Sequence, residues 1–133
     1  MTNERDPVLR TVPRPQDINA NGHIFGGWVL SQMDIVGGII ASRIAEGAVA
    51  TVAIESMQFI SPILLGDIIS LYGQEIRRGR TSVTIHIDVE ATRGLQQQVI
   101  PVTHGVFTFV ALDRNHRPRA LPLPGDHSSV ATA

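Results

Sequence analysis

The chain has 133 residues, 43% of them hydrophobic, and a formal net charge of −1. This length predicts one domain with a core of modest size, and the near-neutral charge argues against a nucleic-acid-binding protein. The chain contains no cysteine. It also contains no lysine, since all 11 basic residues are arginines. These absences exclude thiol nucleophiles, disulfides, cysteine-based metal sites, Schiff-base chemistry and a phosphate-loop lysine. Acid–base or covalent chemistry must therefore come from Asp, Glu, His, Ser, Thr or the single tyrosine, Tyr72.

The sequence favours a cytoplasmic protein. Residues 1–10 (MTNERDPVLR) are polar and lack the apolar stretch of a signal peptide. Residues 24–44 are about as long as a membrane span, but Asp34 at their centre and Gln32 beside it argue against one. We therefore expect neither a membrane partner nor a nucleic-acid partner.

The first predicted elements are a strand, a loop and a long helix. A short strand over residues 7–12 precedes a loop over residues 13–22, which is rich in Pro, Asn and Asp. The helix begins at Phe25–Gly26, where the apolar residues start to recur with a helical period. It ends at Glu46–Gly47, because Gly47 suits a C-terminal cap.

After the helix the hydrophobic period changes from 3.6 to 2, which predicts strands. The clearest alternation is that of Val83, Ile85, Ile87 and Val89 with polar neighbours. The predicted strands cover residues 49–60, 67–77, 81–90 and 100–112, with a turn at 78–80 and a loop at 94–98. We expect the whole chain, 1–133, to be a single domain, ordered over about residues 8–122 and ending in a flexible tail over 123–133.

The predicted helix is apolar or small around nearly its whole circumference, and it carries one carboxylate, Asp34. Aspartate is seldom buried without a partner, so Asp34 is either paired structurally or kept for chemistry. Small residues share its face of the helix at helical spacing: Gly27, Ser31, Gly38 and Ala41. Glycines weaken a helix, so their number here indicates that a ligand or a partner backbone approaches beside Asp34.

One strand, one buried helix and four further strands joined by short turns predict an α+β fold. A five-stranded antiparallel sheet wraps around one long central helix in this arrangement. Such a sheet covers only part of the helix, and the remaining apolar face needs another subunit. The sequence therefore predicts a homodimer at least.

Three segments add a family signature to this pattern. They are NANGHIFGGWVLSQMD at residues 19–34, GRTS at 79–82 and GVFTFVALDRNHRPRALP at 105–122. In this order they resemble the hotdog-fold acyl-CoA thioesterases, and specifically the small bacterial YciA-like group. The first segment is the specific one, and the other two would be weak alone.

The resemblance implies hydrolysis of acyl-CoA to a free acid and CoA, without a metal and without a cofactor other than the CoA of the substrate. It implies a double hotdog dimer, often assembled into a hexamer, with the substrate at the subunit interface. The catalytic carboxylate of the family corresponds to Asp34. The asparagine that works with it from the facing subunit corresponds to Asn19, and the glycines at the helix start correspond to Gly26 and Gly27.

Two positions depart from the family pattern. The position of His23 is often Asp in YciA-like sequences, and the position of His104 is commonly Glu. The catalytic residues are unaffected by these differences. They bear on the substrate range and on local hydrogen bonding.

Two chemical roles stay open for Asp34, which can deprotonate a water molecule or attack the carbonyl directly. The backbone N–H groups of Gly26 and Gly27 at the helix start are expected to polarise the thioester oxygen. Ser31, one helical turn before Asp34, is a candidate partner for the carboxylate and a candidate substrate contact.

Arginines cluster at residues 77–80 and again at residues 114–119. A solvated surface is one interpretation of both clusters. The other is that some of these arginines bind the phosphates of CoA, since a guanidinium suits bidentate phosphate contact. Of the set, Arg80 and Arg119 are the residues that we favour for phosphate binding.

Two other functions compete with thioester hydrolysis. A hotdog hydratase or dehydratase needs a histidine paired with the acid, at the position of Ile39, but no histidine lies between Ile24 and Ile85. A non-catalytic acyl-CoA-binding module has no need for Asp34 and Asn19 together. The histidines show no metal-ligand spacing, so no metal site is expected.

Overall fold

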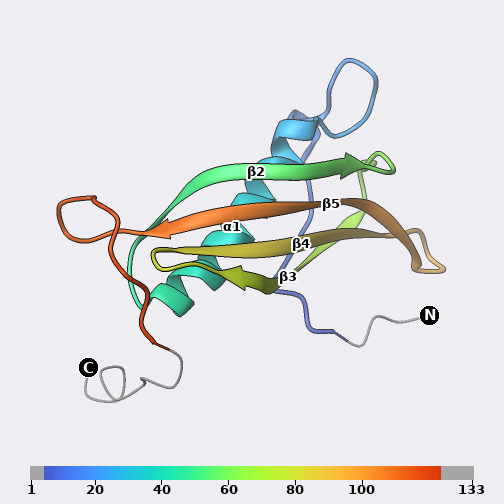
Figure 1. Ribbon diagram of the computed structural model, residues 1–133. Helices are drawn as coiled ribbons and strands as arrows, with labels where there is room; N and C mark the ends of the chain where they lie inside the picture. Colours follow the sequence, from blue (N-terminus) through green and yellow to red (C-terminus); the bar gives the residue numbers. More distant parts are fainter. Residues whose placement is uncertain (1–4, 124–133) are drawn as a thin grey trace.

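The computed structural model describes residues 5–123 as one helix packed on one sheet (Figure 1). The elements in chain order are β1 (Leu9–Thr11), the 3-10 helix η1 (Pro15–Asp17), α1 (Gly26–Ala45), β2 (Val49–Phe59), β3 (Ile68–Arg78), β4 (Ser82–Arg93) and β5 (Gln98–Ala111). All strand pairs are antiparallel, and the strand order is β1-β3-β4-β5-β2. The predicted α+β arrangement is confirmed. The predicted tail lies, from residue 124 onward, outside the described residues.

The alternation in β4 sets the two faces of the sheet. Val83, Ile85, Ile87 and Val89 are buried, and they form the core with Phe107 and Phe109 of β5 and with α1. Their neighbours His86 and Asp88 lie on the opposite face, away from the helix. The period-2 pattern therefore identified the two faces of this central strand correctly, and its register is well specified because a slip of one residue would bury a charged side chain.

Close packing explains one glycine of α1. A Cβ atom on Gly37 would lie 2.6 Å from the ring of Phe109, so only glycine lets the helix approach β5 at this point. Gly38, one residue later, has nothing within 4 Å of the same position. The two glycines therefore differ: Gly37 allows close packing of α1 on β5, and Gly38 leaves open space beside the helix.

The C-terminal end of α1 differs from the prediction by one residue. Glu46, and not Gly47, adopts the left-handed conformation, with a φ of 56°. Gly47 instead donates its N–H to the carbonyl of Ser42 at 3.1 Å and so closes the last turn. A Cβ atom at Gly47 would lie 2.7 Å from a guanidinium nitrogen of Arg119, which gives the glycine a packing reason.

The end of β4 extends three residues beyond its predicted limit, because Arg93 is anchored there. Its guanidinium donates two hydrogen bonds, of 2.8 and 2.7 Å, to the carboxylate of Asp67, which is 1% exposed. Asp67 also accepts the N–H of Leu64 at 2.9 Å. Burial raises the pKa of Asp67, but the hydrogen bonds from Arg93 and Leu64 and the charge of Arg93 bring it below its ordinary value of 3.8.

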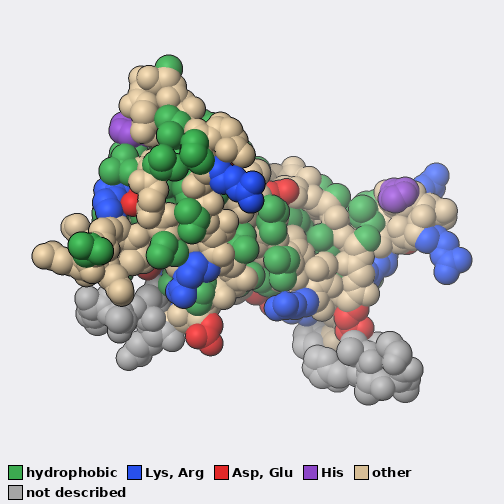
Figure 2. Space-filling view, turned by 180° about the vertical axis from the view of Figure 1, so that it is seen from behind, with side chains coloured by type: hydrophobic (Ala, Val, Ile, Leu, Met, Phe, Trp, Pro, Cys, Tyr) green, Lys and Arg blue, Asp and Glu red, His purple; other side chains and the backbone are tan. Residues whose placement is uncertain are grey.

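The edge strand β2 and the adjoining face of α1 expose large hydrophobic side chains (Figure 2). They are Phe25, Ile35, Val52, Ile54, Phe59 and Ile60. An exposed apolar edge of this kind is a surface on which another chain pairs or packs. Within the described residues, no helix is long and apolar enough to cross a membrane.

Candidate active site

Asp34 projects from the middle of α1 toward β2, where it is half-buried. Its Oδ1 atom accepts a hydrogen bond of 2.6 Å from the hydroxyl of Thr51. Thr51 is the third residue of β2 and is paired with Phe109 of β5, so the sheet fixes the position of its hydroxyl. Among the described residues, Oδ2 of Asp34 has no hydrogen-bond partner. One carboxylate oxygen is therefore held, and the other is available.

The small residues around Asp34 form the stripe that helical spacing predicts. Gly27 and Ser31 are exposed on the N-terminal side, Gly38 is half-buried with open space beside it, and Ala41 is fully buried. The stripe thus runs from solvent at the start of α1 into the core near its end. The open part of the stripe contains Asp34.

The start of α1 offers unused hydrogen-bond donors beside two aromatic rings. The N–H groups of Gly26 and Gly27 have no acceptor within the part of the chain that the structure describes. A Cβ atom on Gly26 would lie 3.7 Å from the ring of Phe59, and one on Gly27 would lie 3.4 Å from the ring of Phe25. The first N–H groups of a helix carry partial positive charge, so they suit a carbonyl oxygen that gains negative charge.

Asn19 organises the loop before α1. Its Oδ1 atom accepts the N–H groups of Asn21 at 2.9 Å and of His23 at 3.2 Å. The backbone N–H of Asn19 donates to the carbonyl of His23 at 2.7 Å, and Gly22 takes the left-handed conformation that the turn requires. The amide nitrogen of the Asn19 side chain has no acceptor among residues 5–123. No hydrogen bond joins Asn19 to Asp34 within one described chain.

The structure does not bring Ser31 to Asp34 by a hydrogen bond. The hydroxyl of Ser31 donates to the carbonyl of Trp28 at 2.8 Å, along its own helix. The residue that holds Asp34 is Thr51, which sequence reasoning missed. Ser31 remains exposed beside the carboxylate, so its predicted contact with substrate stays a prediction.

The two favoured arginines lie in different environments. Arg119 donates from Nε to the carbonyl of Leu112 at 2.9 Å and from Nη2 to the carbonyl of Ala45 at 2.8 Å, and so ties the last strand to the end of α1. These contacts favour a structural role for Arg119, and its predicted phosphate contact stays untested. Arg80 is exposed, and its guanidinium has no partner in the described region.

The remaining arginines of the two clusters are either paired with a glutamate or exposed without an ion pair in the described residues. Arg78 pairs with Glu75 at 2.7 Å, and Arg77 lies 3.8 Å from Glu55. Arg114 and Arg117 are exposed on the loop after β5. Of the first cluster, Arg80 is therefore the arginine best placed to meet an anionic ligand.

The two histidines that depart from the family pattern have separate surroundings. His23 belongs to the loop that Asn19 organises, on the N-terminal side of α1. The ring of His104 stacks on that of His86, with 5.7 Å between centroids, and its Nε2 lies 3.2 Å from the side-chain oxygen of Gln58. Among the described residues, no group of three or more His, Asp or Glu side chains converges on a metal position.

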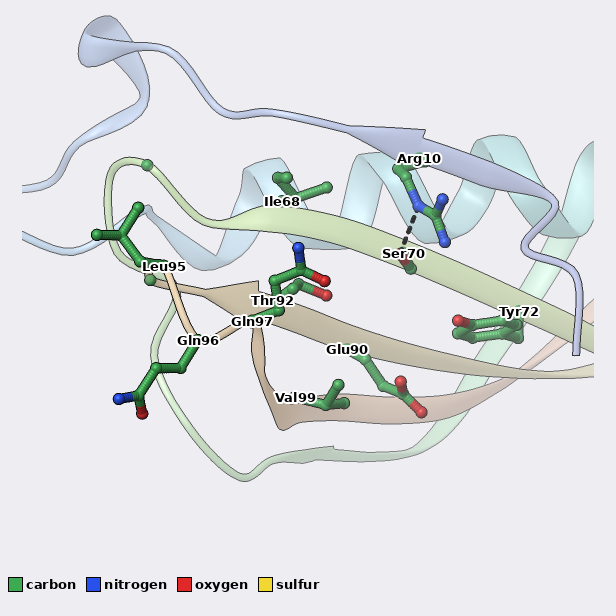
Figure 3. Close-up of a pocket in the computed structure, with 12 residues that line it drawn as sticks. Arg10, Ile68, Ser70, Tyr72, Glu90, Thr92, Leu95, Gln96, Gln97 and Val99 are labelled. Carbon is green, nitrogen blue, oxygen red and sulfur yellow. Dashed lines mark hydrogen bonds between the residues drawn. The ribbon is translucent and has the colours of Figure 1, made fainter. Parts of the chain in front are cut away.

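A concavity of about 860 Å³ lies on the other face of the sheet and contains none of the predicted site residues (Figure 3). It is lined by residues of β1, of β3 and the turn before it, of the end of β4, of the turn between β4 and β5, and of the start of β5. The site around Asp34, by contrast, lies between α1 and the unpaired edge strand β2. In a single chain the site therefore lies at an open edge of the sheet.

Three comparisons relate the chain to known proteins. Residues 21–97 match the family model of the thioesterase superfamily. The acyl-CoA thioester hydrolase YciA of Escherichia coli is 45% identical over 121 residues, which cover 89% of this chain and 92% of YciA.

Two crystal structures share the fold closely. One is a variant of HI0827, a hexameric broad specificity acyl-coenzyme A thioesterase, in which an aspartate is replaced by alanine. It has a TM-score of 0.87 and 44% identity, and the match covers 96% of this chain and 94% of that one. The other is the hexameric thioesterase y2039 of Yersinia pestis, with a TM-score of 0.85, 44% identity and 92% and 99% coverage. The chain therefore belongs to the thioesterase superfamily, within its YciA-like group of hotdog-fold acyl-CoA thioester hydrolases.

Proposed function

We propose that the protein hydrolyses the thioester bond of acyl-CoA to a free acid and CoA, with Asp34 as the catalytic carboxylate. The observation that carries the proposal is the pair of Asp34 and Thr51, 2.6 Å apart on the open edge between α1 and β2. The unused N–H groups of Gly26 and Gly27 lie on the same helix, at its start. A held carboxylate with one free oxygen and a set of N–H donors are the groups that acyl transfer to water needs.

The chemical step follows from these groups. The thioester oxygen accepts hydrogen bonds from the N–H of Gly27 and from that of Gly26, which stabilise the charge that develops on it by about 2.7–4 kcal/mol for each donor. Oδ2 of Asp34 takes a proton from water as the water oxygen bonds to the carbonyl carbon, or attacks that carbon itself before water releases the acid. In the first route the carbon–sulfur bond breaks after water has added, and in the second it breaks as Asp34 forms an anhydride with the acyl group, which water then hydrolyses. In both routes the sulfur of CoA leaves and takes up a proton.

The proposed assembly is a homodimer in which the β2 edges and the α1 faces of two chains meet. The exposed apolar side chains of this surface support it, because they would otherwise stay in water. Asn19 then acts on the Asp34 of the partner, since no hydrogen bond joins the two residues within one described chain. By likeness to the hexameric relatives, three such dimers assemble further. The cytoplasmic location that the sequence favours belongs to the same proposal.

Arg80 is proposed to contact the phosphates of CoA. Its guanidinium is exposed at the turn between β3 and β4 and has no partner in the described part of the chain. Arginine binds phosphate through two parallel hydrogen bonds, so a free guanidinium suits this ligand.

The test is a thiol-release assay with a panel of acyl-CoA esters on the wild type and on Asp34→Asn. The chain has no cysteine, so a thiol-reactive dye reports released CoA alone. We expect the wild type to release thiol and Asp34→Asn to lose at least roughly 100-fold in kcat, since the amide is no base. Circular dichroism should show an unchanged fold in Asp34→Asn, because the side chains are nearly isosteric.

Two results would contradict the proposal. Turnover of Asp34→Asn within a few-fold of the wild type would make Asp34 a structural residue. Binding of acyl-CoA by the wild type without thiol release would indicate a non-catalytic binding module.

A further inference from the structure

The arginines of the chain concentrate at one end of the sheet. Three segments meet there: the last turn of α1 with the residues after it (43–48), the end of β3 with the turn after it (75–82) and the segment after β5 (111–121). The N–H of Ala111 donates to the carbonyl of Thr81 at 2.9 Å. That of Leu112 donates to the carbonyl of Ala48 at 2.9 Å. The three segments hold most of the 11 arginines of the chain and few acidic residues: Arg43, Arg77, Arg78, Arg80, Arg114, Arg117 and Arg119, against Glu46, Glu75 and Asp113.

The loop after β5 projects beyond the end of the sheet and carries two of these arginines (Figure 1). Leu112 and Pro118 form an antiparallel bridge at its base. The carboxylate of Asp113 accepts two backbone N–H groups of the loop, at 2.8 and 3.0 Å, and its own N–H donates to the carbonyl of Arg117 at 2.8 Å. The charge of Asp113 is thus directed at the backbone of its own loop. The side chains of Arg114 and Arg117 are exposed and have no partner among residues 5–123.

The register of the sheet places this cationic end near the carboxylate site. Thr51, which holds Asp34, is paired with Phe109. Phe109 is paired with Val83, and Val83 is paired with Arg78. Neighbouring strands lie about 4.8 Å apart, so roughly 14 Å separates Thr51 from Arg78 along this row. A long ligand whose reactive carbonyl lies at Asp34 can therefore extend along this end of the sheet toward the loop after β5.

The free arginines at this end exceed what one phosphate contact uses. Two of the set face a glutamate, at 3.8 and 2.7 Å, and Arg119 donates to two backbone carbonyls. Arg80, Arg114 and Arg117 keep unpaired guanidinium groups in the described part of the chain. CoA carries a diphosphate at its middle and a separate 3′-phosphate on the ribose, at the end far from the sulfur. A guanidinium binds a phosphate through two parallel hydrogen bonds, so the arginines of the loop suit the second of these groups.

We propose that Arg114 and Arg117 bind the 3′-phosphate of CoA, and that the loop makes the protein prefer esters of CoA to esters of thiols that lack this phosphate. The inference rests on the proposed function, in which acyl-CoA is the substrate. Arg80, on the turn of the sheet, is then left for the diphosphate. Arg119 does not contact the ligand but holds the base of the loop, because its partners are the carbonyls of Leu112 and of the last residue of α1.

Calorimetry measures the Kd of CoA and of 3′-dephospho-CoA for the wild type, for the double variant Arg114→Gln/Arg117→Gln and for Arg10→Gln. The double variant keeps the backbone N–H groups that Asp113 accepts, so the loop stays folded. Arg10→Gln is the control, because Arg10 is an exposed arginine at the concavity on the other face of the sheet. Salt at about 0.15 M screens exposed charges more than about 8 Å apart, so distant arginines add little to the comparison.

We expect the wild type to bind CoA roughly 10- to 100-fold more tightly than 3′-dephospho-CoA, as hydrogen bonds between charged groups predict. In the double variant this ratio should fall below about threefold, while the Kd of 3′-dephospho-CoA stays that of the wild type. The unchanged Kd shows that the fold and the rest of the site are intact. Arg10→Gln should keep the ratio of the wild type.

Other outcomes overturn the inference. These are a wild type that binds the two ligands equally, a double variant that keeps the wild-type ratio or loses both ligands alike, and an equal loss in Arg10→Gln. Binding is measured without turnover, so the proposed function is tested separately by thiol release from acyl-CoA on the same samples. A wild type with the expected ratio that releases no thiol would refute hydrolysis and leave the phosphate site standing. Thiol release with equal Kd values would refute the phosphate site alone.

Discussion

At the scale of single residues, the proposed catalytic carboxylate of Asp34 is held by one hydroxyl from another element. Thr51 donates to Oδ1 of Asp34 at 2.6 Å, and this bond fixes the carboxylate plane. With Oδ1 occupied, Oδ2 is the oxygen that faces any water or thioester at the site. Thr51 is thus a positioning residue, which acts through Asp34.

Replacement of Thr51 by valine should lower kcat and leave KM nearly unchanged. Valine keeps the shape of threonine but has no donor, and a hydrogen bond to a charged group is worth about 1.5–3 kcal/mol, or roughly 10- to 100-fold in rate. Thr51→Ser keeps the hydroxyl and should retain most of the activity. The measurement is steady-state thiol release from one acyl-CoA ester. Equal losses in Thr51→Val and Thr51→Ser would mean that the methyl group matters and the hydrogen bond does not.

The sequence predicted Asp34 but not Thr51, for a physical reason. Asp34 is conspicuous within its own helix, because a carboxylate among apolar residues is seldom present without a partner or a chemical role. Helical spacing favours Ser31 as the partner of Asp34, because contacts one turn apart on a helix can be read from a sequence. Thr51 meets Asp34 through the packing of β2 on α1, and no local pattern encodes that contact. Arg119 is similar, because its carbonyl partners at Ala45 and Leu112 come from separate segments.

At the scale of elements, the type and order of α1 and of the five strands were predictable, whereas their ends and the short helix η1 within the predicted loop were not. Period-2 alternation identified β4, and the apolar run identified α1, because both patterns repeat over many residues. The end of β4 at Arg93 depends on Asp67, which lies 26 residues away and is fixed only in the folded chain. The end of α1 at Glu46 depends on a left-handed residue that is not glycine.

The pair of Asp67 and Arg93 should make stability depend on pH in the acid range. The pKa of Asp67 is lower in the folded chain than the ordinary 3.8, so the unfolded chain binds the proton first. The stabilisation is therefore complete above pH 3.8 and is lost as the pH falls below it toward the folded pKa. Asp67→Asn should cost on the order of 3 kcal/mol at neutral pH, because Arg93 then loses its counter-charge.

Urea unfolding of the wild type and of Asp67→Asn at matched chain concentration measures this effect. The gap in unfolding free energy between them should narrow as the pH falls through 3.8. Glu75→Gln is the control, since its partner Arg78 and Glu75 are both about one-third exposed. Surface pairs contribute about 0–1 kcal/mol, so that variant should change little. A gap between wild type and Asp67→Asn that is independent of pH would mean that the charge of Asp67 is not the stabilising feature.

At the scale of the whole molecule, the proposed site of one chain lies at an edge that a second chain is expected to cover. Asp34 and Thr51 lie on an open edge whose apolar side chains remain exposed, and Asn19 has no bond to Asp34 within the described chain. The side-chain oxygen of Asn19 already accepts two backbone N–H groups of its own loop. Its amide nitrogen is therefore free to donate to a group on another chain.

Complementation between two inactive variants tests whether Asn19 serves the Asp34 of the partner. Asn19→Ala and Asp34→Ala should each lose most activity as pure homodimers. In a hybrid dimer across a two-fold axis, one site then carries both wild-type residues and the other carries neither. Random mixing makes half of the dimers hybrid, so co-expressed chains should recover roughly a quarter of the wild-type activity. Mass-tagged subunits verify that hybrids have formed. If verified hybrids recover nothing, Asn19 and Asp34 belong to the site of the same chain, and the dimer arranges its active sites differently from the arrangement proposed here.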